Sequence, residues 1–579
     1  MMEMINLKID NNLVQVPKGS TVLEAARSIG IKIPSLCYLK GVNSCSACRI
    51  CVVEIGNKLI ASCTLTAEEN MEVKTNTPMV REARRFVVEL LLSNHKRECT
   101  TCVRSENCEL QSAAKDLNIR DIKYSGERLE RGIDISSSSI VRDTEKCILC
   151  GRCISTCANV QTVNAIGFSN RGFQTEVTAA YDKPIGETVC INCGQCIEAC
   201  PVGALSEKSH IDGVWKELAN KEKYVIVQTA PAVRVALGEE FGMDVGIRVT
   251  GKMAAALRAL GFYKVFDTDF AADLTIMEEG TELLKRLNKG EYLPLMTSCC
   301  PGWVKFVEHF YPEMLDNLST CKSPHEMEGA IIKSYYAAKT GIDPNRIVVV
   351  SVMPCVAKKF EGEREELSRE EMQDVDYVLT TRELAQMIKE AGIDFKNIKE
   401  ESFDNPLGES TGAAVIFGAT GGVAEAAIRT VYELTSGKAL DSIEFNSVRG
   451  LEGIKIANID IGNGREITAA VAHGLKNARE LLRMIKNGER KIDFIEVMAC
   501  PGGCVTGGGQ PIINSRLQEE IDVKALRTKA IYEEDRIMPI RKSHENPYIK
   551  ALYEEFLEEP NGHISHELLH TSYIKRDKF

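Results

Sequence analysis

Residues 147–153, CILCGRC, and residues 190–196, CINCGQC, are two copies of one pattern. Each copy is completed by a fourth cysteine, Cys157 in the first and Cys200, followed by Pro201, in the second. Closely spaced cysteines that recur as a unit are typical of a repeated metal-binding site. We therefore expect residues 124–209 to form a domain that binds two metal clusters.

Both runs have the spacing Cys-x2-Cys-x2-Cys-x3-Cys. In bacterial ferredoxins with this spacing, the fourth cysteine of each run binds the other 4Fe-4S cluster. By this rule, one cluster is bound by Cys147, Cys150, Cys153 and Cys200, and the other by Cys190, Cys193, Cys196 and Cys157. Zinc is the alternative, but a zinc site does not require three closely spaced cysteines with a distant fourth.

The composition sets the context for these motifs. A chain of 579 residues, 44% of them hydrophobic, is long enough for about four domains, and its 22 cysteines need an explanation by position. A net charge of −11 argues against a nucleic-acid partner. The N-terminus has no basic region followed by an apolar core, and no apolar run is long enough to cross a bilayer, so we expect a cytoplasmic protein with reduced thiols.

Residues 1–79 are predicted to form a β-grasp domain. Apolar residues alternate over 5–16 around a turn, and Thr21 with Glu24 is typical of a capped helix start running to Gly30. The segment 47–54, ACRICVVE, resembles the 2Fe-2S loop of respiratory complex I and related proteins. The resemblance implies a 2Fe-2S cluster bound by Cys37, Cys48, Cys51 and Cys63. Cys45 leaves the register ambiguous; we favour Cys48 because it fits the family run.

Residues 80–123 are predicted to form a small domain for one further 4Fe-4S cluster. Residues 80–120 are expected to be helical, with the clearest helical spacing over 80–92. The cluster ligands would be His95, Cys99, Cys102 and Cys108. A lone histidine is usually a surface or core residue, but this one precedes a cysteine pair by one helical turn, which matches a site of one histidine and three cysteines.

After residue 209 the sequence alternates between apolar strands and helices. We expect strands at 224–230, 347–353, 413–417 and 494–498, and helices at 252–260 and 424–434. This alternation indicates α/β layers with parallel sheet. The predicted fold class is therefore a multidomain α+β and α/β protein, in which residues 210–579 form a large two-lobed α/β domain.

Three segments of this last part, 297–303 (TSCCPGW), 353–361 (MPCVAKKFE) and 496–511 (EVMACPGGCVTGGGQP), together resemble the signature segments of the iron-only (FeFe) hydrogenases. The resemblance runs along nearly the whole chain. It implies an H-cluster, a 4Fe-4S cluster joined to a two-iron subcluster that carries CO, CN and a dithiolate. The implied ligands are Cys300, Cys355, Cys500 and Cys504, of which Cys504 bridges the two parts.

The same resemblance assigns catalytic roles. Cys299 would transfer protons, as a thiol of pKa ~8.5 can, and Lys358 would donate a hydrogen bond to a cyanide. Glu279, Glu282 and Arg286 share one face of an expected helix. Without the resemblance, such a face would most often be a row of charged side chains exposed to solvent. In the family a proton relay runs from the thiol through Glu279, Ser319 and Glu282 to Arg286.

The implied pocket wall contains Met353, Met498, Pro231, Ala232 and Phe417. Ala232 stands where the better-known single-chain enzymes have serine, so one cyanide hydrogen bond is in doubt. The segment 417–422, FGATGG, could instead be a dinucleotide loop, but it is not G-x-G-x-x-G. Cys321 has no assigned role and is expected to be a buried thiol.

The resemblance implies an enzyme that catalyses 2 H⁺ + 2 e⁻ ⇌ H2, with electrons passing through one 2Fe-2S and three accessory 4Fe-4S clusters. Ala232, the CPGGC form of the last segment and the N-terminal module resemble the catalytic subunit of NAD(P)-linked, ferredoxin-coupled, electron-bifurcating complexes. No flavin or nicotinamide site is recognisable, so that interpretation requires partner subunits. The alternatives are a self-contained ferredoxin-linked hydrogenase, a hydrogen sensor and a non-catalytic relative that assembles iron-sulfur clusters.

Overall fold

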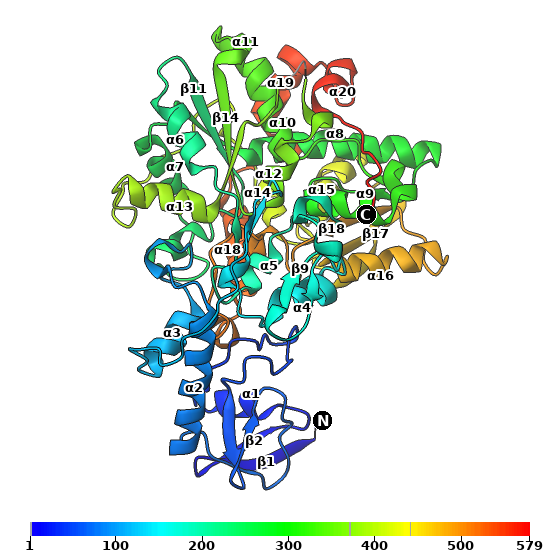
Figure 1. The fold of residues 1–579 in the computed structure, drawn as a ribbon. Coiled ribbons are helices and arrows are strands. Elements are labelled where there is room, and N and C mark those ends of the chain that lie inside the picture. The colour runs from blue at the N-terminus through cyan, green and yellow to red at the C-terminus, as the bar shows by residue number, and fades with distance from the viewer. Residues whose placement is uncertain (1–2, 370–371, 441, 579) are drawn as a thin grey trace.

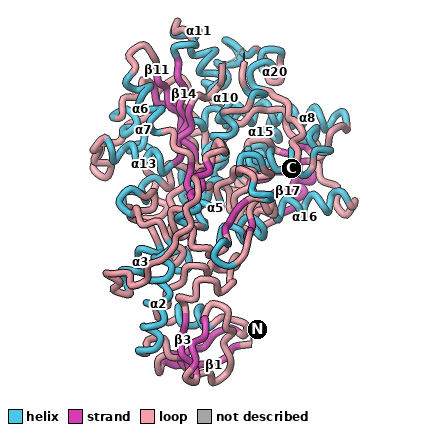
Figure 2. The backbone as a smooth tube through the Cα atoms, viewed as in Figure 1, coloured by secondary structure: helices cyan, strands magenta, loops and turns pink. Residues whose placement is uncertain are grey.

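The computed structural model describes residues 3–369, 372–440 and 442–578. In it the cysteine-rich parts before residue 210 follow one another from one end of the molecule to the large C-terminal part (Figure 1). The N-terminal domain lies at one end, and α2 (Pro78–Asn94) leads away from it. The part with the two cysteine runs lies against the large C-terminal part. Figure 2 shows the longest strands gathered in the C-terminal part, with helices around them.

The N-terminal domain has the predicted hairpin and capped helix. Strand β1 (Met4–Ile9) pairs antiparallel with β2 (Asn12–Pro17) and parallel with β5 (Glu72–Val73). A second hairpin is formed by β3 (Val52–Ile55) and β4 (Lys58–Ala61). In α1 (Val22–Ser28) Thr21 and Glu24 form a reciprocal capping box, which satisfies backbone N–H groups at the helix start.

The next segment is only partly helical. Helix α2 (Pro78–Asn94) confirms the periodic stretch, and α3 (Glu109–Asp116) follows after a single 3-10 turn, Cys99–Thr101. The expectation of helix throughout 80–120 is therefore wrong for most of residues 95–108. These residues have no apolar face at helical spacing that could pack onto a core, so periodicity gives them no reason to continue α2.

The two cysteine runs have the same backbone shape. In each, a left-handed glycine, Gly151 (φ 74°) or Gly194 (φ 71°), directly precedes a short helix, α4 (Arg152–Ser155) or α5 (Gln195–Ala199). Glycine adopts this conformation without a Cβ penalty, so the Cys-Gly-x-Cys spacing can wrap tightly. The accompanying strands are β6 (Ile133–Asp134), β7 (Ile140–Asp143), β8 (Gly167–Ser169), β9 (Glu176–Thr178) and β10 (Leu205–Glu207).

The C-terminal part contains two four-stranded sheets, one in each lobe. The first has the order β12-β11-β14-β15 and is parallel throughout; the second has the order β13-β18-β17-β16 and is parallel except for β16. The strands are β11 (Tyr224–Thr229), β12 (Lys264–Asp267), β13 (Leu295–Met296), β14 (Ile347–Met353), β15 (Tyr377–Thr380), β16 (Ile454–Asp460), β17 (Glu466–His473) and β18 (Phe494–Met498). The predicted α/β architecture is confirmed.

One predicted strand is wrong. Residues 413–417 form the short helix α14 (Gly412–Val415) and a 3-10 turn, Ile416–Gly418, rather than a strand. The segment is apolar and buried on all sides, where it packs between α8 (Thr268–Lys289) and α18 (Val523–Ile537). A short, fully apolar run has no period that separates strand from helix, so the sequence could not decide between them.

The C-terminal part contains further helices. They are α6 (Ile211–Ala219), α7 (Thr250–Ala259), α9 (Pro301–Phe310), α10 (Pro324–Ile331), α11 (Ala337–Thr340), α12 (Ala357–Gly362), α13 (Thr381–Glu390), α15 (Gly422–Ser436), α16 (Leu475–Lys486), α17 (Leu517–Glu520), α19 (Pro547–Leu552) and α20 (His563–Leu569). The C-terminal helix α20 packs on α10. Among the described residues, none of the helices is both long and apolar enough to cross a membrane.

Candidate active site

Four cysteines from the three signature segments meet between the two lobes. Cys355 follows β14 and Cys500 follows β18, each by two residues, while Cys300 precedes α9 and Cys504 begins a 3-10 turn. Burial, and after it the nearby Cys300 and Cys355 thiols, raises the pKa of Cys504. Thiols this close together in a buried site provide four soft sulfur donors, the ligand set that a 4Fe-4S cluster takes.

Glycines allow the signature segments to approach this closely. A Cβ on Gly507 would lie 2.1 Å from the Pro354 carbonyl oxygen, and one on Gly503 (φ 102°) would lie 2.6 Å from the Thr420 nitrogen. A side chain at Gly507 would push the third segment away from the second, and one at Gly503 would push it away from the loop around Thr420. The backbone therefore forms a cradle around the four sulfurs that fits a large inorganic group.

Cys299 lies beside this set, in apolar surroundings. It packs, half-buried, against the cluster of side chains that contains Ala232, Phe417 and Met498. Burial, and then the carboxyl of Glu279, raises the pKa of the Cys299 thiol well above its usual value. The thiol is therefore protonated at neutral pH, and the Glu279 carboxyl is the nearby acid that acts on it most strongly.

The predicted relay residues lie near one another, and the relay begins beside this thiol. Glu279 and Glu282 are buried on α8, and burial, followed by repulsion from Glu282, raises the pKa of Glu279 to about 8. Ser319 Oγ donates a hydrogen bond to Glu282 Oε2 at 2.7 Å. Arg286 Nη2 donates to the other oxygen, Glu282 Oε1, at 2.6 Å. The structure thus brings together all the residues predicted for the relay.

Lys358 has partners that the sequence did not assign. Its Nζ donates to Glu361 Oε2 at 2.6 Å, to Ser323 Oγ at 2.8 Å and to the Cys299 carbonyl oxygen at 3.2 Å. Burial alone would lower the pKa of Lys358, but the Glu361 carboxylate outweighs it and raises the pKa. The ammonium is therefore kept charged beside the cradle.

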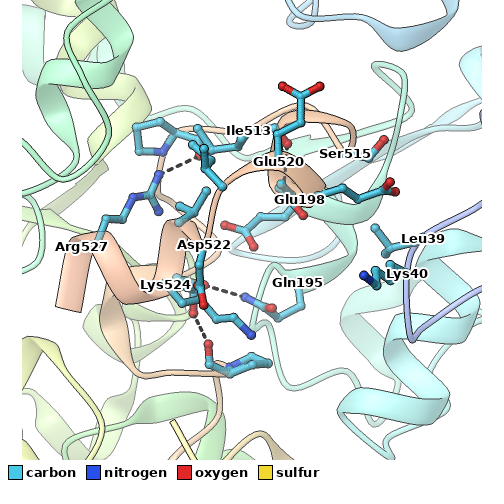
Figure 3. Close-up of a pocket in the computed structure, with 17 residues that line it drawn as sticks. Leu39, Lys40, Gln195, Glu198, Ile513, Ser515, Glu520, Asp522, Lys524 and Arg527 are labelled. Atoms are coloured by element: carbon cyan, nitrogen blue, oxygen red, sulfur yellow. Dashed lines mark hydrogen bonds between the residues drawn. The ribbon is translucent and has the colours of Figure 1, made fainter. Parts of the chain in front are cut away.

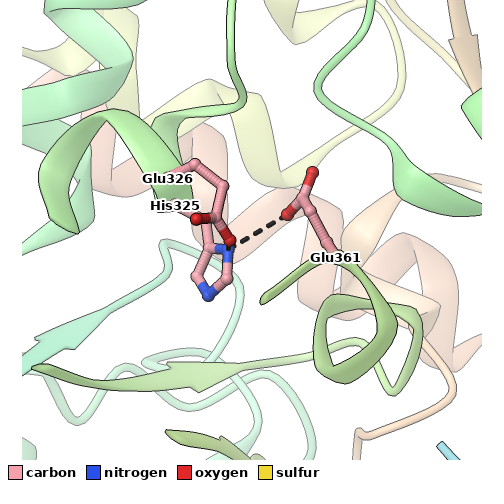
Figure 4. A group of neighbouring side chains, drawn as sticks. All are labelled: His325, Glu326 and Glu361. Atoms are coloured by element: carbon pink, nitrogen blue, oxygen red, sulfur yellow. Dashed lines mark hydrogen bonds and ion pairs between the residues drawn. The ribbon is translucent and has the colours of Figure 1, made fainter. Parts of the chain in front are cut away.

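Glu361 is held in turn by His325 (Figure 4). His325 Nδ1 lies 3.0 Å from Glu361 Oε2 and 2.8 Å from Glu326 Oε1, and its Nε2 lies 2.7 Å from Ser351 Oγ. Because the imidazole already bridges two carboxylates and a hydroxyl, we interpret this group as a support for Lys358 rather than as a metal site. The only sequence signal for this support of Lys358 was the Lys-x-x-Glu spacing of Lys358 and Glu361 on α12.

The remaining predicted pocket residues are all buried. Met353 ends β14, Met498 ends β18, and Phe417 lies in the 3-10 turn after α14. Pro231 and Ala232 follow β11, and Gln510 Nε2 donates to the Ala232 carbonyl oxygen at 2.8 Å. Gln510 is a further residue that sequence reasoning missed.

In the glycine-rich loop before α15, the N–H groups that a dinucleotide phosphate would need are paired within the chain. The N–H groups of Gly421 and Ala424 donate to the Glu496 carboxylate at 2.6 and 2.8 Å. A helix N-terminus attracts phosphate because its N–H groups are free, and here a carboxylate of the chain already accepts them. A Cβ on Gly422 would also lie 1.7 Å from the Ile416 carbonyl oxygen, so the loop has no open cleft at this point.

The two ferredoxin-type runs line two neighbouring cavities. The lining of the first includes Cys147, Cys150, Cys153 and Cys200, and that of the second includes Cys157, Cys190, Cys193 and Cys196. The second adjoins the active site: Gln195 Nε2 lies 3.5 Å from Cys500 Sγ, and a Cβ on Gly508 would lie 2.5 Å from the Cys193 carbonyl oxygen. Each cavity thus combines three cysteines of one run with the fourth of the other.

In the N-terminal domain Cys37, Cys48, Cys51 and Cys63 are close enough for thiol-to-thiol hydrogen bonds. Hydrogen bonds from Cys48 and Cys63 lower the pKa of Cys37 to about 2. Cys45 lies outside this group: it is exposed, and its thiol is 3.5 Å from the Cys150 carbonyl oxygen of the neighbouring domain.

His95 directly follows α2 and is buried. Within the described ranges, its Nδ1 is a buried polar atom without a hydrogen-bond partner. Buried polar atoms are normally paired, so an unpaired ring nitrogen in a cysteine-rich turn fits a ligand to iron. Burial lowers the pKa of His95, which favours the neutral imidazole that binds metal.

We expect His95→Ala to alter one accessory cluster and leave the others intact. The measurement is the EPR spectrum of the reduced protein at cryogenic temperature, in which one 4Fe-4S signal should shift or disappear. His210→Ala is the control. Burial lowers the pKa of His210 as well, but His210 lies in no cysteine-rich turn. An EPR spectrum of His95→Ala identical to the unmodified one would make His95 a bystander.

A cavity of about 640 Å³ lies between the 2Fe-2S domain and the segment 511–527 (Figure 3). Its lining includes Lys40, Gln195, Glu198 and Arg527 but contains no cysteine, so it is not a cluster site. Burial raises the pKa of Glu198 to about 7.

Several sets of cysteines that can bind iron-sulfur clusters follow one another in this structure. The last set lies in the buried cradle, with a thiol and a carboxyl group beside it. Together these features define an iron-sulfur oxidoreductase. Family models agree with this class: iron only hydrogenase large subunit, C-terminal domain, at residues 223–508; iron hydrogenase small subunit at 521–576; 2Fe-2S iron-sulfur cluster binding domain at 2–78; NADH-ubiquinone oxidoreductase-G iron-sulfur binding region at 84–123; and NADH-quinone oxidoreductase subunit 3, ferredoxin-like domain, at 137–206.

Similar proteins narrow the class. The chain is 52% identical to the NADP-reducing hydrogenase subunit HndD of Solidesulfovibrio fructosivorans, over 100% of both chains. It is 43% identical to iron hydrogenase 1 of Clostridium pasteurianum, over 96% of this chain and 98% of the relative. The apo [FeFe]-hydrogenase HydA1 of Chlamydomonas reinhardtii is a solved structure with 42% identity and a TM-score of 0.57, covering 64% of this chain and 99% of its own.

The chain belongs to the iron-only (FeFe) hydrogenases, oxidoreductases that act on H2. The predicted family, enzyme class and multidomain iron-sulfur architecture are confirmed.

Proposed function

We propose that this hydrogenase is the catalytic subunit of an NAD(P)-linked, ferredoxin-coupled, electron-bifurcating complex. The observation that carries the proposal is the full-length similarity to a subunit of an NADP-reducing hydrogenase. The loop before α15 resembles a dinucleotide loop in sequence, but its Gly421 and Ala424 N–H groups donate to Glu496. Partner subunits would therefore bind flavin and nicotinamide. We also propose a cytoplasmic location, where NAD(P) and ferredoxin are found.

The proposal divides the chain into an electron path and a proton path. Residues 1–79, 80–123 and 124–209 would hold one 2Fe-2S and three 4Fe-4S clusters, and residues 210–579 the H-cluster. The cluster of Cys157, Cys190, Cys193 and Cys196 would be the one next to the H-cluster, which the contact between Gln195 and Cys500 supports. Electrons would leave toward the N-terminal domain and the partner.

When bound by Cys300, Cys355, Cys500 and Cys504, the H-cluster supplies the chemistry that joins or separates two protons and two electrons. The Cys299 thiol would give or take the proton at its Sγ, and Glu279 would exchange that proton with the thiol. Ser319 would pass it to Glu282, to which its hydroxyl is already hydrogen-bonded. Lys358, fixed by Glu361, would hold the cyanide side of the group, and the apolar wall of Met353, Met498 and Phe417 would exclude water.

The partner proposal is tested by anaerobic purification of the tagged chain from its native cells. We expect a flavoprotein to copurify, and the complex to reduce NAD(P)⁺ with H2 only when ferredoxin is also present. The chain alone should exchange electrons with viologen but not with NAD(P)⁺. The second candidate, a self-contained ferredoxin-linked hydrogenase, is favoured by the 43% identity to iron hydrogenase 1. A chain that purifies alone and turns over rapidly with ferredoxin would support that candidate and overturn the first.

A further inference from the structure

Arg286, the outer end of the predicted relay, has no free N–H group in this structure. Its Nε and Nη2 donate to Glu282 Oε1, its Nη2 also donates to the Leu318 carbonyl oxygen, and its Nη1 donates to the carbonyl oxygens of Tyr292 and Asp316. A guanidinium has no acceptor and keeps its proton at any ordinary pH. Arg286 can therefore fix Glu282 in place, but a proton that reaches Glu282 needs another group to continue.

A second set of contacts leads from Glu282 to such a group. Thr320 Oγ1 lies 3.3 Å from Glu282 Oε1 and 2.8 Å from His570 Nδ1. The other ring nitrogen, His570 Nε2, lies 3.2 Å from Glu278 Oε2. Imidazole gains and loses protons near neutral pH, which a guanidinium does not. The contacts thus form a continuous path of exchangeable hydrogens from Glu282 to an imidazole.

Charged and titratable groups surround His570 on each element that packs against it. Helix α8 contributes Glu278, Glu282 and Lys285. The backbone of Cys321 pairs with that of His570. The Tyr553 hydroxyl donates a hydrogen bond to Glu278 Oε1 at 2.5 Å. On α20 the exposed ring of His566 lies with its centroid 4.3 Å from that of His570. The Glu278 carboxylate thus lies on one side of the His570 ring, and the exposed His566 ring lies beside it.

We propose that His570 is the outer proton carrier of this hydrogenase, reached from Glu282 through Thr320. The inference rests on the proposed relay. During H2 oxidation the Glu282 carboxyl gives its proton to Thr320 Oγ1 as the Thr320 hydroxyl gives its own to His570 Nδ1. One proton leaves the carboxyl and one arrives at the imidazole, which becomes imidazolium and then releases a proton to bulk water beside His566. Proton uptake runs along the same bonds in reverse.

The chain contains a matched control. His544 makes the same pattern away from the relay, with Nδ1 3.2 Å from Thr430 Oγ1 and Nε2 3.1 Å from Glu433 Oε2. His544→Gln therefore removes an imidazole held between a threonine and a glutamate without touching Glu282. Thr320→Val removes the linking hydroxyl at nearly constant volume and leaves His570 in place, so it tests the path even where His570→Gln weakens the fold.

The experiment measures H2 oxidation with a viologen acceptor across pH in the fully matured enzyme. We expect His570→Gln and Thr320→Val to lower turnover by roughly threefold to tenfold, less than loss of the thiol itself, and to change the shape of the pH profile in the same way. His544→Gln should match the unmodified enzyme. Wild-type pH profiles in both His570→Gln and Thr320→Val would overturn the proposal.

A readout independent of turnover is the infrared difference spectrum on switching from N2 to H2, with ¹⁵N-labelled histidine. An imidazole ring band that shifts with the label should be present in the unmodified enzyme and in His544→Gln, and absent from His570→Gln. If the band persists in His570→Gln, the protonated histidine is another one and the inference fails. Failure of the relay as a whole is recognised separately, because Cys299→Ala would then retain its activity.

Discussion

Cys299→Ala is expected to lower H2 turnover by at least ~10²-fold, the range in which a positioned acid-base group contributes. The thiol lies beside the cradle, and burial with the neighbouring Glu279 keeps it protonated. Alanine leaves the apolar packing around Ala232, Phe417 and Met498 in place but has no exchangeable proton. Electrons would still arrive, while protons would lack their last carrier.

The adjacent residue supplies the contrast for this measurement. Cys300→Ala removes one of the four sulfurs that converge in the cradle, so iron content and the infrared bands of CO and CN should both fall. Cys299→Ala should keep both near the unmodified values. If Cys299→Ala instead loses iron, Cys299 is a ligand and its role as a proton carrier is wrong.

The sequence predicted most reliably those features that depend on neighbouring residues. The Cys-x2-Cys-x2-Cys spacing determines a local wrap around left-handed glycines, Gly151 and Gly194, and the structure repeats that wrap in both copies. The capping box at Thr21 and Glu24 is local in the same sense. The segment 413–417 shows the limit, because a short apolar run buried on all sides fits a strand or a helix equally well until its neighbours are known.

Contacts between distant residues could not be predicted in this way. Lys358 was assigned from a resemblance, but His325, which holds its partner Glu361, lies on another helix and has no sequence signal that links it to the lysine. Thr320 and His570 are 250 residues apart and meet only because α20 packs on α10. From the sequence alone, Glu279 and Arg286 were only charged residues on one face of a helix. The fold turns that face inward.

Burial gives Glu279 an unusual protonation state. With a pKa raised from 4.5 to about 8, the folded protein keeps this carboxyl protonated at neutral pH, whereas the unfolded chain ionises it. The unfolded state therefore binds fewer protons between these two values, and folding stability falls as pH rises through that range. Glutamine has the shape of a protonated glutamate and does not titrate.

Glu279→Gln should therefore keep the fold and lose the activity. We expect turnover to fall by ~10²-fold, because an amide can donate and accept hydrogen bonds but cannot pass a proton on. We also expect the melting temperature of Glu279→Gln to increase relative to that of the unmodified protein as pH rises from 4.5 to 8. Glu409→Gln, at a carboxyl outside the proposed relay, is the control for both measurements. Near-normal turnover in Glu279→Gln would remove Glu279 from the proton path, and a melting difference that does not change with pH would show that the carboxyl is ionised in the folded protein.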